Sequence, residues 1–357
     1  MFTEDTREAI HLMMDVYNDR HNDAILFIAK YYFEEIGVIE ASLSSFDERK
    51  LTLSIKTKSD TCTRNIEFEA EPSNSSEAAA YLLECLSEAR NKAPEDEPKT
   101  KIEVEIEKNQ KLKTYITQVS ATNKISSNII EITFKNGLED LPNIRNDAFL
   151  FFIVPKVKKN KFPKGFSMAD YRSMVGQEDQ KLFGAYYTVK SFRKNEIDVW
   201  FVLHKDPGPL ADWASKAELG DHVAVWGPRT SFLPPEKTSN YLFIADETAQ
   251  PAVLASVENL PKHDDFLCLF ETQNMSTQYT YELEKERIEW VYRDSDKAGE
   301  GDKLLNRINE LDLDVKNLYI FGAGEGKQMS KIRKLLKKKY LIKSNQITLT
   351  GYWRKTK

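Results

Sequence analysis

The sequence is poor in the residues that build covalent or metal-linked frameworks. Among 357 residues it holds three cysteines, Cys62, Cys85 and Cys268, and five histidines. The cysteines lie far apart and are odd in number, so they predict neither a disulfide framework nor a Cys-x-x-Cys metal site. No His-x-x-x-His pair occurs either, and we expect no metal that is tightly held by protein ligands. A reducing cytoplasm is the simplest compartment for such a chain.

Long apolar runs and an excess of positive charge are also missing. No apolar run approaches the roughly 18 residues of a membrane span. Residues 1–8 show no basic region followed by the apolar core of a secretory signal. The formal net charge is −5, which argues against a general nucleic-acid binder. We therefore expect a cytoplasmic globular protein of two or three domains, with no membrane span and no nucleic-acid partner.

Residues 1–95 have the pattern of a small α+β domain. Apolar residues recur at helical spacing over 22–37. The segment 74–77 carries a capping signal that predicts the start of a second helix. Between the two helices, period-two alternation predicts strands. These expected strands lie at about 38–43, 50–57 and 64–70.

Two changes of pattern mark further domains. A charged, proline-bearing linker at 93–100 precedes a region that turns to strands near residue 101. Closely spaced strands with turn signals predict an antiparallel β-barrel over 101–236. Over 237–357 buried strands alternate with helical segments, which predicts a parallel sheet with covering helices. The expected fold is thus multidomain, α+β and α/β.

An ordered series of short motifs begins on a predicted barrel strand and continues to the end of the sequence. The motifs are Tyr187-Thr188-x-Lys190, Phe201-Val-Leu-His204, Gly208-Pro209-x-x-x-Trp213-Ala214, Gly220-Asp…Gly227-Pro-Arg229, Ala245-Asp-Glu-Thr-Ala-x-Pro-Ala252 and Gly351-Tyr-Trp-Arg354. In this order and spacing they resemble the siderophore-interacting protein family, flavin-dependent ferric-siderophore reductases of the ferredoxin-reductase type. The resemblance covers about residues 110–357. It implies an FAD-binding barrel domain and an NAD(P)H-binding α/β domain. Residues 1–95 loosely resemble an accessory domain of unknown function that is sometimes fused to this family.

The resemblance implies a set of flavin contacts. Tyr187 and Thr188 would line the flavin ring, with the Thr188 hydroxyl near its reactive edge. Gly208 opens a short helix whose free N–H groups and dipole suit the pyrophosphate. His204 has the alternative of a core histidine, and helix capping alone would explain Thr248. The implied cofactor-binding residues are Tyr187, Thr188, Val189, Lys190, His204, Gly208, Pro209, Leu210, Ala211, Trp213, Ala214, Asp246, Glu247, Thr248 and Trp353.

Two positions depart from the family pattern. Ala185 stands where the family has an arginine for the pyrophosphate, a charge-assisted contact worth about 1.5–3 kcal/mol. Lys190 replaces that contact only in part, because an ammonium cannot make a bidentate bond. Phe151 stands where the family has a lysine that faces the substrate. Its presence opens the alternative of a neutral or cationic hydroxamate chelate.

The same resemblance implies the remaining binding residues. The implied nicotinamide-binding residues are Ala323, Gly324 and Glu325. The implied siderophore-binding residues are Arg229 and Arg354, since cations hold anionic catecholates by charge and by cation–π contact. Lys156 is a further candidate, on the expectation that it reaches the space of the lysine that Phe151 replaces. The lysine-rich helix that follows contains candidates for a 2′-phosphate, with a solvated helix face as the alternative. These candidates are Lys327, Lys331 and Arg333.

The implied activity is that of an oxidoreductase. Reduced nicotinamide would pass hydride to FAD, and FAD would pass single electrons to Fe(III) in a siderophore, which frees Fe(II) in the cytoplasm. Reduced ferredoxin is an alternative donor. No side chain is predicted to act as a catalytic acid, base or nucleophile. Two other functions stay open: a non-catalytic siderophore- or partner-binding protein with a weakened flavin site, and a reductase that uses flavin as a diffusing substrate.

Overall fold

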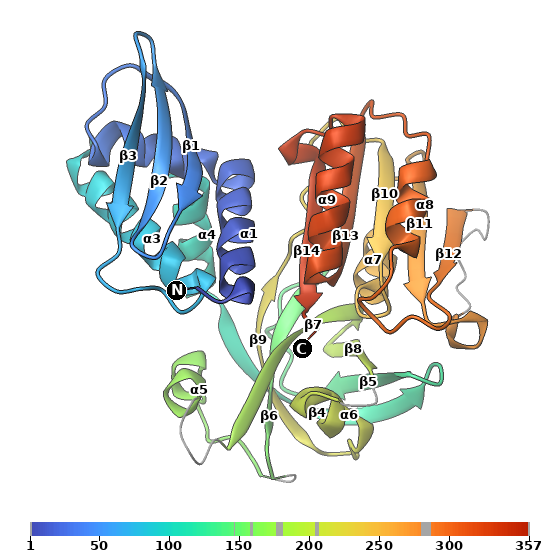
Figure 1. The fold of residues 1–357 in the computed structure, drawn as a ribbon. Coiled ribbons are helices and arrows are strands. Elements are labelled where there is room, and N and C mark those ends of the chain that lie inside the picture. Colours follow the sequence, from blue (N-terminus) through green and yellow to red (C-terminus); the bar gives the residue numbers. More distant parts are fainter. Residues whose placement is uncertain are drawn as a thin grey trace. The chain divides into compact units, whose positions relative to one another are not determined.

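A computed structural model of the chain separates into two compact units, Met1–Lys111 and Leu112–Lys357 (Figure 1). The residues that the structure describes are 2–145, 147–157, 160–175, 181–203, 207–279 and 287–355. Each unit has its own hydrophobic core, and each is treated separately below.

The first unit packs helices on one face of a three-stranded antiparallel sheet with the order β1-β2-β3. Its elements are α1 (Glu4–Arg20), α2 (Asn22–Phe27), the π-helical turn η1 (Ile28–Tyr32), β1 (Val38–Phe46), β2 (Lys50–Thr57), β3 (Thr61–Glu67), α3 (Ser75–Lys92) and α4 (Lys101–Gln110). The three expected strands and the second helix are present. Asn74 caps α3 by accepting the backbone N–H groups of Ser76 and Glu77.

Strand structure from residue 101 onward was expected, and this prediction is wrong. Lys101–Gln110 form helix α4, although their apolar residues alternate with glutamates as in a strand. A capping box between Thr100 and Glu103 starts the helix. Arg90 of α3 then holds Glu103 at 2.7 Å. These local bonds outweigh the period-two pattern, and α4 belongs to the first unit. The division into domains at 1–95, 101–236 and 237–357 stays our proposal.

The second unit begins with a closed antiparallel barrel of strand order β4-β5-β8-β7-β6-β9. Its elements are β4 (Lys113–Lys124), β5 (Ile129–Lys135), β6 (Phe149–Pro155), α5 (Met168–Met174), β7 (Leu182–Arg193), β8 (Glu196–Val202), α6 (Pro209–Ser215) and β9 (His222–Arg229). Phe134, Phe152 and Phe201 are fully buried in its core. Leu210 and Trp213 bring α6 into the same core.

A five-stranded parallel sheet of order β12-β11-β10-β13-β14 follows the barrel. Its elements are β10 (Asn240–Ala245), α7 (Gln250–Val257), β11 (Asp265–Thr272), the 3-10 turn η2 (Met275–Thr277), β12 (Ile288–Tyr292), α8 (Lys303–Glu310), β13 (Leu318–Glu325), α9 (Gly326–Tyr340), the 3-10 turn η4 (Ser344–Gln346) and β14 (Ile347–Trp353). Helices α8 and α9 cover one face and α7 the other (Figure 1). The predicted barrel and parallel sheet are confirmed. Within the described part of the chain, no helix has the length and apolar character needed to span a membrane.

Candidate active site

Several polar side chains of the second unit lie together at the carboxyl ends of the parallel strands. Asp246 follows β10, Glu271 lies near the end of β11, Glu325 ends β13 and Trp353 ends β14. Ligands of open α/β sheets bind at this edge, because the strand ends and the helix N-termini that follow them meet there. Residues from opposite ends of the domain's sequence are thereby brought together.

Asp246 is the central acceptor of this edge, and only 3% of its surface is exposed. Its Oδ1 accepts the Thr248 backbone N–H at 2.9 Å and the Thr248 hydroxyl at 2.5 Å, and its Oδ2 accepts the Trp353 indole N–H at 2.7 Å. A Cβ placed on Gly324 would lie 3.1 Å from that Oδ2. Burial, and secondly the charge of Glu247, raise the pKa of Asp246. Three other predicted site residues therefore meet around the Asp246 carboxylate.

The prediction that Thr248 caps the following helix is wrong. The N-cap position of α7 is Ala249, and no side chain caps the helix there. The Thr248 hydroxyl donates to Asp246 instead, because the turn folds back on the preceding strand end before the helix begins.

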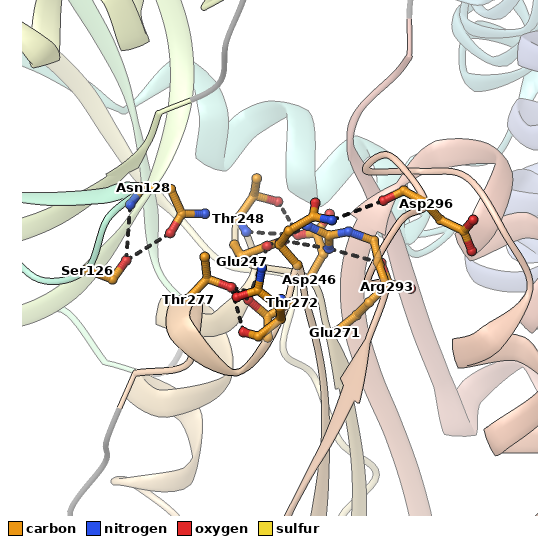
Figure 2. A network of polar contacts seen from close by, with 12 residues as sticks. Ser126, Asn128, Asp246, Glu247, Thr248, Glu271, Thr272, Thr277, Arg293 and Asp296 are labelled. Atoms are coloured by element: carbon orange, nitrogen blue, oxygen red, sulfur yellow. Dashed lines mark hydrogen bonds and ion pairs between the residues drawn. The ribbon is translucent and has the colours of Figure 1, made fainter.

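Glu247 belongs to a second network, which Figure 2 shows around Arg293. Arg293 follows β12 and is 4% exposed. Its guanidinium donates to both Glu247 carboxylate oxygens at 2.9 and 2.6 Å and to Glu271 at 3.3 Å. Thr272 donates to Glu247 at 3.2 Å, and Gln328 donates to Glu271 at 3.0 Å. Burial raises the pKa of Glu271 to about 6 despite the opposing charge of Arg293.

Sequence reasoning missed this network. Arg293 lies 46 residues from Glu247 and 22 from Glu271, and it belongs to no motif of the series above. One feature of the sequence could have indicated Glu271 as a site residue. Like Asp246, it lies at the carboxyl end of a predicted buried strand. The network holds the Asp246–Thr248 turn in place through Glu247, because both Glu247 carboxylate oxygens accept from the Arg293 guanidinium.

Two hydroxyl groups lie buried where strand β7 of the barrel approaches the sheet. Thr188 is 5% exposed, and its Oγ1 and the Tyr352 Oη have no hydrogen-bond partner among the described residues. Burial raises the pKa of Tyr352, the charge of Asp147 adds to this effect, and the nearby Thr188 hydroxyl opposes it, although the two hydroxyls do not reach hydrogen-bond geometry with each other. An unpaired buried hydroxyl costs free energy unless a ligand supplies the missing partner. The donors and acceptors present therefore fit the polar edge of a flavin ring.

The other predicted barrel residues are largely internal. The Tyr187 ring lies 4.4 Å from that of Phe201, and burial raises the pKa of Tyr187 to about 12. Val189 is 1% exposed within the same core. Lys190 donates to Glu258 at 2.8 Å. Contacts of these three residues with a flavin stay a prediction.

Helix α6 divides its predicted residues between the core and an open end. Gly208 is the N-cap, no side chain caps the helix, and a Cβ at Gly208 would meet nothing within 4 Å. Pro209 follows in the first turn. The remaining predicted residues are buried, which leaves the N-terminal backbone as the accessible part. These buried residues are Leu210, Ala211, Trp213 and Ala214. The predicted His204 lies outside the described residues.

The turn predicted for nicotinamide is tightly packed. Ala323 and Glu325 are 1% and 2% exposed. Glu325 caps α9 by accepting the Gln328 backbone N–H at 2.9 Å. Of the candidates for a 2′-phosphate, Lys331 donates to Asp302 at 3.1 Å and Arg333 donates to a backbone carbonyl at 2.7 Å.

The three predicted siderophore-binding cations lie in different places. Arg229 ends β9 and pairs in register with Phe149 of β6. Lys156 follows the opposite end of β6, about 20 Å away at the usual rise of a strand. Arg354 follows β14 and contacts the Gly326 region. Lys156 is thus separated from Arg229 along the strand, and its contact with a siderophore stays a prediction.

Asp147, just before β6, is a buried residue that sequence reasoning missed. It is 0% exposed. Its carboxylate accepts the Ser231 N–H at 2.8 Å, the Ser231 hydroxyl at 2.6 Å, the Phe232 N–H at 3.1 Å and the Thr230 hydroxyl. Asp147 therefore fixes the chain that leaves Arg229 and connects the barrel to the sheet.

Two family models match the second unit. The model described as the siderophore-interacting FAD-binding domain matches residues 118–232, and the model described as the siderophore-interacting protein matches residues 238–356. Together the two matches cover more than half of the chain, and they meet where the barrel passes into the parallel sheet.

Several curated relatives are similar to parts of the chain. The ferric vibriobactin reductase of Vibrio cholerae is 28% identical over 176 residues, which are 48% of this chain and 64% of the relative. The ferric acinetobactin reductase of Acinetobacter baumannii is 28% identical over 47% of this chain and 59% of the relative. The NADPH-dependent ferric-chelate reductase of Escherichia coli is 26% identical over 45% of this chain and 61% of the relative. The chain thus spans about three fifths of the length of these relatives.

Solved structures establish the fold of the second unit. A siderophore utilization protein from T. fusca superposes with a TM-score of 0.59 at 23% identity, over 69% of this chain and 94% of that protein. The siderophore-interacting protein of Aeromonas hydrophila superposes with a TM-score of 0.56 at 21% identity, over 69% and 93%. These likenesses agree with the observed barrel and sheet, and the two family-model matches show that the chain belongs to the siderophore-interacting protein family.

Proposed function

We propose that this chain is a ferric-siderophore reductase that binds FAD, takes electrons from NADH or NADPH, and reduces Fe(III) to Fe(II) so that iron is released in the cytoplasm. The observation that carries the proposal is the pair of buried, unpartnered hydroxyls of Thr188 and Tyr352. They lie between the barrel and the sheet edge that holds Asp246. The names of the curated relatives support the same activity.

The residues of this chain have binding and orienting roles in the proposal. Thr188 and Tyr352 hydrogen-bond the polar edge of the flavin ring, and Trp353, oriented by Asp246, packs beside it. The open backbone at Gly208 faces the pyrophosphate. When bound, FAD supplies the conversion of a two-electron donor into single-electron steps toward Fe(III). The iron is substrate, and its reduction requires no proton from the protein.

A non-catalytic binding protein is the second candidate. Ala185 lacks the guanidinium that the family places against the pyrophosphate, and Lys190 is held by Glu258 at 2.8 Å. Both observations favour weak flavin binding. A reductase that uses flavin as a diffusing substrate would share this weakness but would turn over flavin without any chelate.

The deciding experiment is a visible absorption spectrum of the protein purified without added flavin, followed by titration with FAD. Bound flavin that is bleached anaerobically by NADPH, NADH or reduced ferredoxin, and restored by a ferric siderophore, is the expected result. Comparison of the three donors assigns the electron source. A colourless protein that binds no FAD at micromolar concentration contradicts the proposal and leaves the binding protein as the surviving candidate.

A further inference from the structure

A buried carboxylate without a counter-charge lies beside the two unpartnered hydroxyls. Asp147 is 0% exposed, and the hydrogen bonds that the structure describes for its side chain are all donated to the carboxylate. The donors are the hydroxyls of Thr230 and Ser231 and the backbone N–H groups of Ser231 and Phe232. Accepting alone is the pattern of an ionised carboxylate. Among the described residues no cation pairs with Asp147, so neutral dipoles stabilise its charge.

The strand register places Asp147 next to Thr188. Phe149 of β6 pairs with Thr188 of β7, and the Val189 N–H donates to the Ala148 carbonyl at 2.9 Å. Asp147 directly precedes Ala148 in the sequence. Since two residues of extended chain span roughly 7 Å, the Asp147 carboxylate lies close to the backbone that carries the Thr188 hydroxyl.

Tyr352 responds to the same charge. Burial, and secondly the charge of Asp147, raise the pKa of the Tyr352 hydroxyl, and the charge of Asp246 adds to them. A raised pKa means that the site resists negative charge on the Tyr352 oxygen. A ligand that bonds to this hydroxyl meets the same resistance. The site therefore favours a neutral group over an anionic one.

Two other buried carboxylates of the second unit show the usual arrangement, in which a cation balances the charge. Asp198 of β8 is 4% exposed and pairs with Arg193. Glu271 pairs with Arg293 at 3.3 Å. A cation at the same distance from Asp147 would cancel most of its electric field. Without one, the field extends to the neighbouring hydroxyls.

We propose that the Asp147 carboxylate holds the reduction potential of a flavin bound at Thr188 and Tyr352 below that of free FAD. The proposal rests on the proposed reductase function and names a residue that sets its driving force. Uptake of two electrons and one proton leaves one negative charge on a flavin ring, whereas the oxidised ring is neutral. The charge of Asp147 disfavours the reduced ring and has little effect on the oxidised one.

A low flavin potential suits the proposed substrate. A chelator that binds Fe(III) more tightly than Fe(II) lowers the potential of the iron in proportion to that preference. A flavin that is bound more weakly when reduced is a stronger electron donor, and it can reduce such a chelate further. Asp147 contributes its charge alone, because no proton or electron passes through it.

The test is the midpoint potential of bound FAD, measured anaerobically by equilibration with a reference dye. In the unaltered protein we expect a value below that of free FAD, which means that oxidised FAD binds more tightly than reduced FAD. Asp147→Asn should shift this preference about tenfold toward reduced FAD, which for a two-electron couple raises the potential by about 30 mV.

Two further variants separate charge from structure. Ser231→Ala keeps the Asp147 charge and removes a donor that lies 2.6 Å from it, so the potential should fall. A purely structural role would move Asp147→Asn and Ser231→Ala in the same direction. Asp198→Asn is the matched control, because its buried carboxylate is balanced by Arg193, and the potential should stay unchanged.

Three results overturn the proposal. A potential of the unaltered protein at or above that of free FAD contradicts it, whether or not Asp147→Asn folds. An unchanged potential in a folded Asp147→Asn that binds FAD contradicts it as well, and this result leaves the proposed reductase intact. A protein that binds no FAD contradicts the reductase and this proposal together, so the two failures are distinguished by the flavin spectrum.

Discussion

Thr188 and Tyr352 bury hydroxyl groups at a point where the barrel and the parallel sheet approach each other. A buried hydroxyl without a partner loses its hydration and gains nothing in return. The free energy of the protein without ligand therefore contains a penalty that an appropriate ligand removes. A single substitution that removes such a hydroxyl should therefore not lower the stability of the ligand-free protein, but it should lower the affinity for the ligand.

We predict that Thr188→Val leaves the stability of the flavin-free protein unchanged or raises it, and lowers FAD affinity about five- to thirtyfold, which corresponds to one lost hydrogen bond of about 1–2 kcal/mol. Thermal unfolding without ligand and FAD titration measure the two effects. Thr117→Val is the matched control, since Thr117 is 2% exposed and donates to the Lys135 carbonyl at 3.0 Å. The control should lose stability and keep FAD affinity. Unchanged FAD affinity in Thr188→Val would contradict a flavin contact at this hydroxyl.

At the scale of elements, Arg293 ties together three strand ends. It follows β12 and pairs with Glu247 after β10 and with Glu271 on β11. All three side chains are at most 6% exposed. The pairing keeps the Asp246–Thr248 turn in place at the edge where ligands of such sheets bind. Removing the buried counter-charge would leave Glu247 and Glu271 as uncompensated buried charges.

We predict that Arg293→Met lowers the free energy of unfolding of the second unit by about 3–5 kcal/mol, because two carboxylates stay buried without their cation. Arg307→Met is the control. Arg307 of α8 pairs with Glu289 of β12 with about one third of each side chain exposed, and its loss should cost under about 1 kcal/mol. Denaturant unfolding monitored by tryptophan fluorescence compares the two variants. Equal costs would show that the Arg293 network does not support the edge.

At the scale of the whole molecule, one buried carboxylate in each unit should contribute to stability with opposite pH dependence. Burial alone would raise the pKa of Glu103 in the first unit, but hydrogen bonds from Arg90 and Thr100 lower it to about 2. Burial raises the pKa of Glu271 in the second unit to about 6. A lowered carboxylate pKa stabilises the fold above the ordinary value and loses this contribution as pH falls. A raised one stabilises the fold at low pH and loses its contribution as pH rises.

We predict that Glu103→Gln flattens the fall in stability of the first unit as pH drops from about 4.5 toward 2. Glu271→Gln should flatten the fall in stability of the second unit as pH rises from about 4.5 through 6. Calorimetric unfolding of the full chain across this pH range separates the two variants. If Glu271→Gln instead changes the acid limb, the Glu271 carboxylate is stabilised rather than penalised by its surroundings.

The sequence by itself determined the architecture and the order of the site motifs. Alternation over the barrel strands and the change to strand–helix repeats after Pro234 arise from local burial, which a linear pattern records. Asp246 and Trp353 were predicted as site residues because they lie in recognisable motifs, and the structure joins them at 2.7 Å. Local pattern failed at 101–110, where a capping box and Arg90 made a helix of an alternating segment.

Only the tertiary structure decided which side chains face one another. Arg293 and Asp147 contact residues 46 and 84 positions away, and such pairings leave no periodic trace in the sequence. The same holds for Phe151, which the register of the barrel strands pairs with Tyr186. Residue composition and spacing predict helices and strands, because these elements depend on residues that are close together along the chain. Contacts between elements depend on register and packing, and these exist only once the barrel closes and the sheet assembles.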